Sequence, residues 1–283
     1  MNELWISLSS DGGVTTRTAL DVLWAAGIRQ VELAIGVKPS VDTTAVLQHY
    51  RQRGMQYRAH HAIVWQEHRS FNRAEQFDRS YFDPLTDWMA AMNITAYSVH
   101  PGSVSLHRSD TVNQWLDQLE QLAQLCCEHV PVCQRQRGIR FGVETMYPSL
   151  FAQTRCELPR SRTEIEQFLT VLPQVEIVVD MAHLNLWHDC STAEKLHLFQ
   201  IAQNRILEIH ISDNDGLRDT HTAINEKTWW TPHVANFPSD VPIVLESRMN
   251  HQSSEQVHQR VQQTQALFDG VTVHEPETHR AII

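Results

Sequence analysis

The chain is poor in lysine, which occurs only as Lys38, Lys195 and Lys227 among 283 residues. Acidic side chains outnumber basic ones by 33 to 23, so the formal net charge is −10 with histidine neutral. Nucleic-acid surfaces are usually basic, so this balance disfavours a nucleic-acid partner without excluding a local basic patch. Because only Lys38 lies near the end of a predicted strand, a Schiff-base aldolase is disfavoured as well.

The sequence also lacks a metal-type CxxC pair and any long hydrophobic run. The five cysteines are an odd number without a CxxC pair, which predicts reduced thiols in a cytoplasmic protein. No apolar run approaches the roughly 20 residues that span a bilayer. The N-terminal stretch lacks a basic region, so we expect a first strand there and not a secretion signal. We therefore expect no membrane partner, and a homo-oligomer stays open.

A strand pattern followed by a helix pattern recurs eight times. Near-continuous apolar strands that alternate with amphipathic helices indicate a parallel sheet covered by helices. The strands are expected at 4–9, 30–35, 55–61, 95–100, 139–144, 175–180, 205–212 and 241–247, and the helices at 15–27, 41–53, 81–92, 111–129, 163–172, 192–202 and 253–268, with only a weak helix after the seventh strand.

Eight such units predict an α/β fold of the (β/α)8 TIM barrel type in one domain. We assign residues 1–270 to the barrel and 271–283 to a C-terminal tail without a clear period. A doubly wound open sheet is the alternative. It is less favoured because the GxGxxG motif, typical of the dinucleotide-binding sheets of that class, does not follow the first strand. The chain has no low-complexity segment that would mark a domain boundary.

Six consecutive strands, the third to the eighth, end in side chains that bind metals. Their carboxyl ends should meet at one rim of the barrel, where the active sites of this fold lie. In chain order these donors are His60 or His61, His100, Glu144, Asp180 with His183, His210 with Asp219 and His221, and Glu246.

Each donor alone has an ordinary structural explanation. With 17 histidines in the chain, a lone His100 is weak evidence, and Asp180 suits a helix cap. Buried carboxylates on strands are costly unless they are paired or bound to a cation. Imidazole and carboxylate groups that converge on one rim therefore predict a divalent metal site.

These motifs resemble those of the xylose isomerase-like TIM barrel superfamily, which includes sugar phosphate isomerases and epimerases as well as endonuclease IV. The resemblance spans nearly the whole chain and rests on VHPGS at His100, on DxxH at Asp180 and His183, and on DxH at Asp219 and His221. It implies a common metal core of Glu144, Asp180, His210 and Glu246. The endonuclease IV branch would add His60 (or His61), His100, His183, Asp219 and His221.

The resemblance implies an enzyme that uses one to three divalent metal ions per chain, zinc or manganese first and magnesium or cobalt next. We expect an isomerase or epimerase of a small sugar or sugar phosphate. Glu144 and Glu246 would bind metal and move protons from opposite faces of the substrate, as in the family's epimerases. His183 and Arg218 would hold substrate oxygens, although Arg218 is equally well explained as an exposed loop cation. Arg248 would bind a phosphate or carboxylate, or only neutralise the acidic rim.

The alternative is a zinc phosphodiesterase of the endonuclease IV type. The nine filled donor positions favour it. Three departures disfavour it: the segment Asp180-Met181-Ala182-His183 in place of D-[ST]-C-H, the segment from Ser212 to Gly216 in place of N-[DS]-S-K, and the lack of a basic loop that would hold a phosphate backbone. A binding module without catalysis is disfavoured because no donor is missing.

These motifs do not predict which substrate binds, because the loops at the rim of the barrel shape the pocket. The segments 64–78 and 222–238 are the main candidates. The second contains Trp229-Trp230, an apolar pair that would cover a sugar ring, form a lid or dimer contact, or belong to the core. Of the two we expect Trp229 to contact the substrate.

Overall fold

The computed structural model describes residues 2–11, 13–34, 42–60, 79–100, 103–105, 134–148, 155–157, 159–249 and 252–269. The expected helix 111–129, the rim loop 64–78, the tail 271–283, His61 and Lys38 lie outside the described residues.

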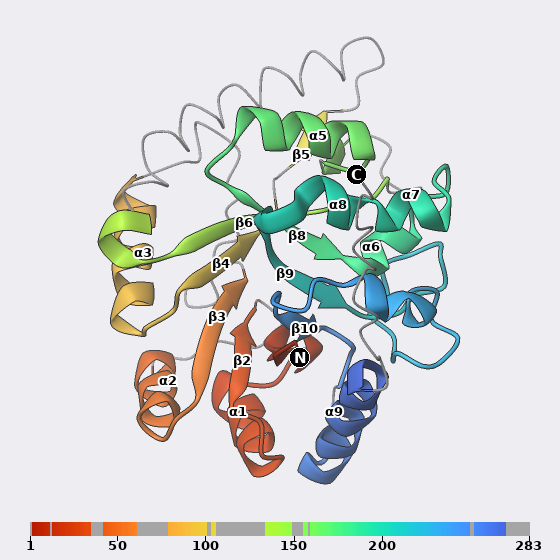
Figure 1. Cartoon of the computed structure of the whole chain (residues 1–283). Coiled ribbons are helices and arrows are strands. Elements are labelled where there is room, and N and C mark those ends of the chain that lie inside the picture. The colour runs from red at the N-terminus through yellow and green to blue at the C-terminus, as the bar shows by residue number, and fades with distance from the viewer. Residues whose placement is uncertain are drawn as a thin grey trace, which may run out of the picture.

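Eight parallel strands form a closed barrel in the order β1-β10-β9-β8-β6-β4-β3-β2, which confirms the expected (β/α)8 fold (Figure 1). Each expected strand lies within a residue or two of its observed position. The barrel strands are β1 (Leu4–Ser7), β2 (Gln30–Leu33), β3 (Gln56–His60), β4 (Ala96–Val99), β6 (Arg140–Glu144), β8 (Glu176–Asp180), β9 (Ile206–Ile211) and β10 (Ile243–Leu245).

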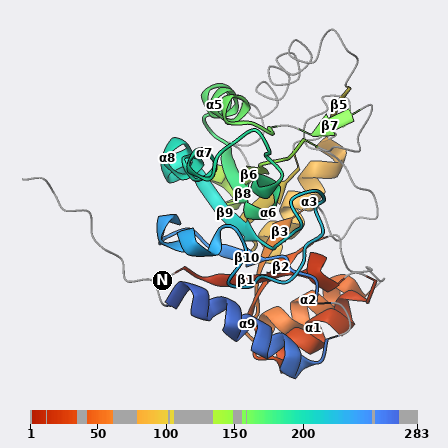
Figure 2. The same ribbon diagram turned by 90° about the vertical axis from the view of Figure 1, so that its right-hand side faces the viewer.

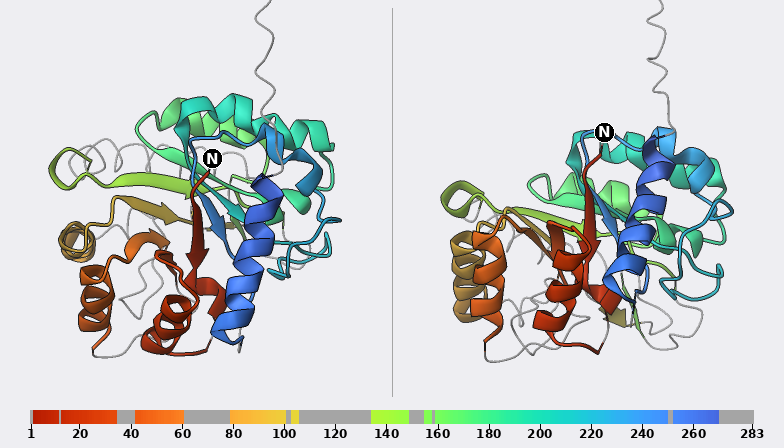
Figure 3. Two further views of the ribbon diagram at one scale, coloured as in Figure 1. Left: turned by 60° about the horizontal axis from the view of Figure 1, so that its bottom comes forward. Right: turned by 90° about the horizontal axis from the view of Figure 1, so that it is seen from below.

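Helices surround the barrel, and α1 lies between α2 and α9 (Figures 1 and 3). None of the helices in the described part of the chain is long and apolar enough to cross a membrane. The α-helices are α1 (Thr16–Ala25), α2 (Thr43–Gln52), α3 (Arg79–Ala91), α5 (Arg162–Val171), α6 (Met181–Asn185), α7 (Thr192–Leu196), α8 (Leu198–Ala202) and α9 (Ser254–Asp269), and the 3-10 turns are η1 (Leu8–Asp11), η2 (Gln203–Arg205) and η3 (Thr231–Asn236).

Two local features differ from the expectation. The helix expected over 192–202 is divided at His197 into α7 and α8, which bury different faces: Lys195 in α7, and Leu198 and Phe199 in α8. An additional antiparallel pair, β5 (Ser103–Ser105) with β7 (Arg155–Glu157), lies outside the barrel (Figure 2). Both strands are only three residues long, too short to give a sequence pattern.

Strand alternation divides the barrel residues into two sets. The large hydrophobic cluster contains one set, for example Val31, Tyr57, Val143 and Ile209, together with residues of the helices. The other set faces the barrel interior, where the hydrophobic cluster consists only of Ala96, Val178 and Leu207. Most of the remaining interior positions carry polar or charged side chains, and Trp5, Gly142 and Val244 are the apolar exceptions among the described strands. The apolar core is therefore between strands and helices, and the centre of the barrel is polar.

A β-bulge in β9 decides which of its residues face inward. Ile206 pairs with Ile177 of β8, but the next pair is Glu208 with Val178, so Leu207 is an extra residue. After this shift Glu208 and His210 point to the interior, while Ile209 and Ile211 join the outer core. Without the extra residue the alternation would turn Glu208 and His210 towards the helices. Bulges commonly re-aim side chains next to functional sites in this way.

Gly142 of β6 should not tolerate a larger residue. A Cβ atom there would lie 2.7 Å from Leu207 Cδ2 and 2.9 Å from Val178 Cγ2. We expect Gly142→Ala to lower the free energy of unfolding by about 1–3 kcal/mol, as overpacking of a close-packed interior does. Urea unfolding measures this change. The double variant with Leu207→Ala should lose less than the sum of the single variants, and strict additivity would contradict the contact.

Candidate metal centre

Four of the predicted donors meet at the carboxyl ends of adjacent barrel strands. Glu144 ends β6, Asp180 ends β8, His210 lies in β9, and Glu246 follows β10. One ligand atom from each lies within 4.8 Å of the others. All four side chains are buried, with exposed fractions between 0% and 3%. We refer to these residues as the four-donor group.

The other five predicted donors adjoin this group in two sets. His60 and His100 form the first set with Glu144: His100 Nε2 is 3.0 Å and His60 Nε2 is 3.6 Å from Glu144 Oε2. The second set, which we call the loop set, consists of His183, Asp219 and His221. Its two imidazole Nε2 atoms lie 3.3 Å and 3.0 Å from Asp219 Oδ2. The structure thus brings the predicted donors together, with His60 at the position from β3; the alternative His61 lies outside the described residues.

Hydrogen bonds to the protein fix which nitrogen each of two histidines presents. His60 Nδ1 is 3.0 Å from the hydroxyl oxygen of Ser98, which itself donates to the carbonyl of Ala59. The Nδ1–H group of His60 therefore donates to Ser98, and Nε2 is left facing Glu144. His183 Nδ1 donates to the Thr145 carbonyl at 2.7 Å, which leaves its Nε2 facing Asp219. Metal-binding histidines typically use one nitrogen for such a bond and the other for the ion.

Asp180 serves two neighbours with its two oxygens. Oδ1 accepts the backbone N–H of His183 at 2.7 Å and so caps the N-terminus of α6. Oδ2 is buried and has no hydrogen-bond partner. The helix-cap explanation of Asp180 is correct for one oxygen, and the other oxygen is free to face the four-donor group.

Charge interactions shift the pKa values of these groups strongly. Burial opposes ionisation of Glu144, but His100 and His183 hold the pKa of Glu144 well below its usual value. Burial opposes charge on His210 as well, yet Glu246 and Glu32 raise the pKa of His210 well above normal. Burial raises the pKa of Asp180 to about 7 against the attraction of His183. In the absence of a metal, protons on the imidazoles therefore balance part of the carboxylate charge.

A divalent cation fits the chemistry of these donors. Several buried ligand atoms lack a hydrogen bond, among them Glu144 Oε2, Asp180 Oδ2, His210 Nδ1, and Asp219 Oδ1 and His221 Nδ1 of the loop set. Buried polar atoms without partners are costly in proteins and rare. Three carboxylates and an imidazole in one buried group are ligands that Mn²⁺ and Zn²⁺ bind. Such an ion would satisfy the unpaired atoms and replace the imidazole protons.

The predicted substrate-binding residues lie around this centre. Arg218 is exposed in the loop that carries Asp219, and Arg248 is exposed two residues after Glu246, where its backbone N–H donates to the His221 carbonyl. Trp229 is partly buried, and its indole N–H donates to the Met181 carbonyl of α6 at 3.0 Å. Their contact with a substrate stays a prediction. Trp230 is completely buried and belongs to the hydrophobic core.

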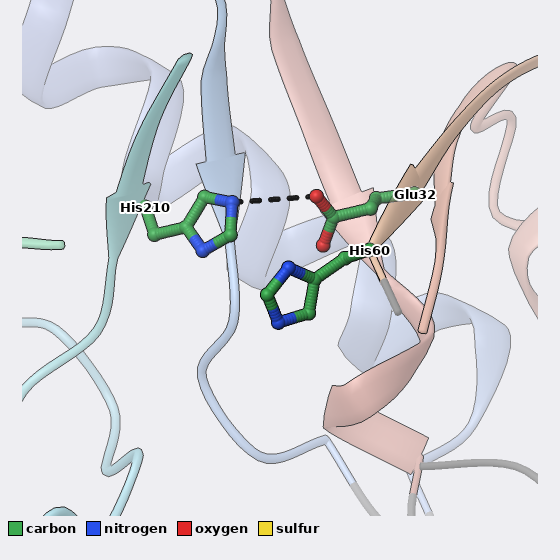
Figure 4. A group of neighbouring side chains, drawn as sticks. All are labelled: Glu32, His60 and His210. Atoms are coloured by element: carbon green, nitrogen blue, oxygen red, sulfur yellow. Dashed lines mark ion pairs between the residues drawn. The ribbon is translucent and has the colours of Figure 1, made fainter. Parts of the chain in front are cut away.

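The sequence analysis missed charged residues in the middle of strands. Glu32 of β2 approaches His210 (Figure 4). Glu208 of β9 approaches the same histidine, and Arg58 of β3 forms an ion pair with Glu208. Each of the three is a charged residue inside an apolar strand, and that was the available signal. The first strand also contributes, because Ser9, shortly after β1, donates to Glu246 at 3.3 Å.

Comparison with known proteins identifies the family. A family model described as xylose isomerase-like TIM barrel matches residues 20–267. No curated protein matches the sequence.

Solved structures of the same architecture include three epimerases or epimerase-like proteins. The first is a D-tagatose 3-epimerase-like protein (14% identity, TM-score 0.70, covering 95% of this chain and 98% of that chain). The second is an L-ribulose 3-epimerase (12%, 0.62, covering 93% and 86%). The third is the D-psicose 3-epimerase of Clostridium cellulolyticum H10 with D-tagatose (11%, 0.60, covering 96% and 93%). At these identities the likeness concerns the fold, and the family match is what assigns the sequence: the chain belongs to the xylose isomerase-like TIM barrel family.

Proposed function

We propose that the protein is a divalent-metal-dependent isomerase or epimerase of a small sugar or sugar phosphate. The observation that carries the proposal is the four-donor group, in which Glu144 Oε1 and Glu246 Oε2 lie 3.6 Å and 3.5 Å from the same atom, His210 Nδ1. The three similar structures support the sugar class, because their names give ketose 3-epimerases.

Glu144 and Glu246 are the residues suited to move protons. They belong to the ends of β6 and β10, which are separated in the barrel by β8 and β9, so they approach the centre from different sides. In an epimerisation, one carboxylate removes the proton from the carbon beside the carbonyl group. The other, as a carboxylic acid, returns a proton to the opposite face of that carbon, and exchange with water restores both groups. A bound divalent ion would supply Lewis-acid stabilisation of the negative charge that develops on the substrate oxygens.

The exposed arginines and the tryptophan provide candidates for substrate recognition. Arg218 directly precedes Asp219, Arg248 follows Glu246 by two residues, and both would bind a phosphate or a carboxylate, which the planar guanidinium group can hold with two hydrogen bonds. Because the N–H group of Trp229 donates to the Met181 carbonyl, a sugar would contact Trp229 through its ring, on the side away from Lys195 Nζ, which lies 5.2 Å from the ring centre.

Turnover of ketoses in D₂O tests the proposal. The wild-type protein, loaded with Mn²⁺, should convert a ketose into its C3 epimer or the matching aldose and introduce solvent deuterium at the carbon that loses its proton. Glu246→Gln should lower kcat/KM by at least about 100-fold, the scale of lost general acid–base catalysis, and weaken metal binding while the fold stays intact. The exposed Glu255→Gln in α9 is the matched control. Full activity and metal binding in Glu246→Gln would remove Glu246 from the site.

Metal binding itself should stabilise the protein. A ligand that binds only the folded state at 100 times its Kd adds about 2.7 kcal/mol to the free energy of unfolding. We expect Mn²⁺ or Zn²⁺ to raise Tm, and Asp180→Asn to reduce this rise because the amide is a weaker ligand. Asp189→Asn, an exposed aspartate beyond α6, serves as the control. An equal metal-dependent shift in wild type and Asp180→Asn would contradict ligation by Asp180.

The second candidate is a zinc phosphodiesterase of the endonuclease IV type. It is favoured by the two additional sets of donors, which extend the centre beyond the needs of one ion: His60 and His100 beside Glu144, and the loop set of His183, Asp219 and His221. In that reaction several ions would share the donors and activate water for attack on a phosphodiester.

Metal stoichiometry and DNA incision separate the two candidates. For the isomerase we expect about one Mn²⁺, Mg²⁺ or Co²⁺ per chain and no incision of a duplex that contains an abasic site. Elemental analysis and gel electrophoresis measure the two quantities. About three zinc ions per chain, with incision that a His221→Ala variant loses, would favour the phosphodiesterase over the isomerase.

A further inference from the structure

Two carboxylates lie below His210 on the side away from the four-donor group. Glu32 Oε2 and Glu208 Oε1 are each 3.3 Å from His210 Nε2. All three side chains are completely buried. Figure 4 shows Glu32 from β2 pointing across the barrel to His210 of β9, with His60 beside them.

The carboxylates determine which nitrogen of His210 carries a proton. Glu208 is ionised beside Arg58, and a carboxylate only accepts hydrogen bonds, so Nε2 presents its N–H group to Glu208. In the neutral ring the other nitrogen then has a lone pair. That nitrogen, Nδ1, is buried without a hydrogen bond and faces Glu144 and Glu246.

Glu208 and Glu32 are held in different ways. Arg58 donates through Nε to Glu208 Oε2 and through Nη2 to the Leu207 carbonyl, and its guanidinium lies 5.4 Å from the centre of the Trp5 ring. The charge of Glu208 is therefore balanced and its position is fixed. Neither oxygen of Glu32 has a hydrogen bond, and its ion pair is with His210. The bulge at Leu207 is what turns Glu208 and His210 to the same interior.

We propose that Glu208 and Glu32 are positioning residues of the metal centre: Glu208 accepts the Nε2–H group of His210, Glu32 forms an ion pair with the same nitrogen, and together they leave Nδ1 as an unprotonated metal ligand. This inference rests on the proposed metal dependence and adds residues that touch neither metal nor substrate. A carboxylate behind a metal-binding histidine typically changes metal affinity by 10-fold to 100-fold.

Co²⁺ is the probe for the test, because its visible absorption reports the ligand field. We expect Glu32→Gln to weaken Co²⁺ binding by about 10-fold to 100-fold and to shift the absorption bands, while Tm of the metal-free protein falls little. Glu208→Gln should act in the same direction. Glu208→Gln also leaves Arg58 buried and unpaired, which would destabilise the fold. The double variant Arg58→Met/Glu208→Gln removes both charges and therefore controls for this effect. Glu176→Gln, which loses an exposed ion pair with Arg140 on the same barrel, should bind Co²⁺ like wild type.

Three outcomes would overturn the positioning role. The first is unchanged Co²⁺ affinity and absorption in Glu32→Gln and in both Glu208 variants. The second is a loss of one bound Co²⁺ per chain in Glu32→Gln, because Glu32, His60 and His210 would then form an ion site of their own. The third is a wild type that binds no Co²⁺. If the wild type binds Co²⁺, the variants bind it more weakly and no ketose is converted, then the sugar proposal fails and the positioning role stands.

Discussion

The contacts of one buried carboxylate, that of Glu144, connect the parts of the candidate centre. Imidazoles from four different segments reach it: His60 and His100 at Oε2, and His183 and His210 at Oε1. A fully buried carboxylate without compensating charge would be strongly destabilising. His100, His183 and His210 therefore stabilise Glu144 in the metal-free protein, and Nε2 of His100 and Nδ1 of His210 can each exchange a proton for a cation. A single arrangement thus serves both the folding of the barrel and the binding of metal.

The fold remains stable with a charged interior because the apolar core lies on the other face of the strands. Hydrophobic side chains on the outer face of the strands pack against the helices and supply the apolar core. The interior can then be polar, provided that its charges are paired, as in the Arg58–Glu208 ion pair below the centre. The interior contacts form a continuous series from the Trp5 ring through the charged groups Arg58, Glu208 and His210 to Glu144. Support and ligands are therefore parts of one buried network.

The sequence predicted the fold and the donors at strand ends because both leave periodic or positional signals. Apolar strands and amphipathic helices recur at regular intervals, and a donor directly after an apolar run is conspicuous. Glu32, Arg58 and Glu208 were not selected, because their pairing depends on strands that are distant in sequence but adjacent or opposite in the barrel. The break at His197 and the burial of Trp230 depend likewise on tertiary packing. The roles of Arg218, Arg248 and Trp229 remain predictions.

The extra residue in β9 has a consequence for how relatives of this protein should be aligned. Leu207 shifts the inward-facing phase of the strand by one position, so that Glu208 and His210, and not Ile209 and Ile211, enter the barrel. A relative with a regular strand in this place would need its histidine one position earlier or later to reach the same point. Counting positions from the start of the strand would then assign the wrong residue, and superposition of the backbones is the sounder guide to equivalence.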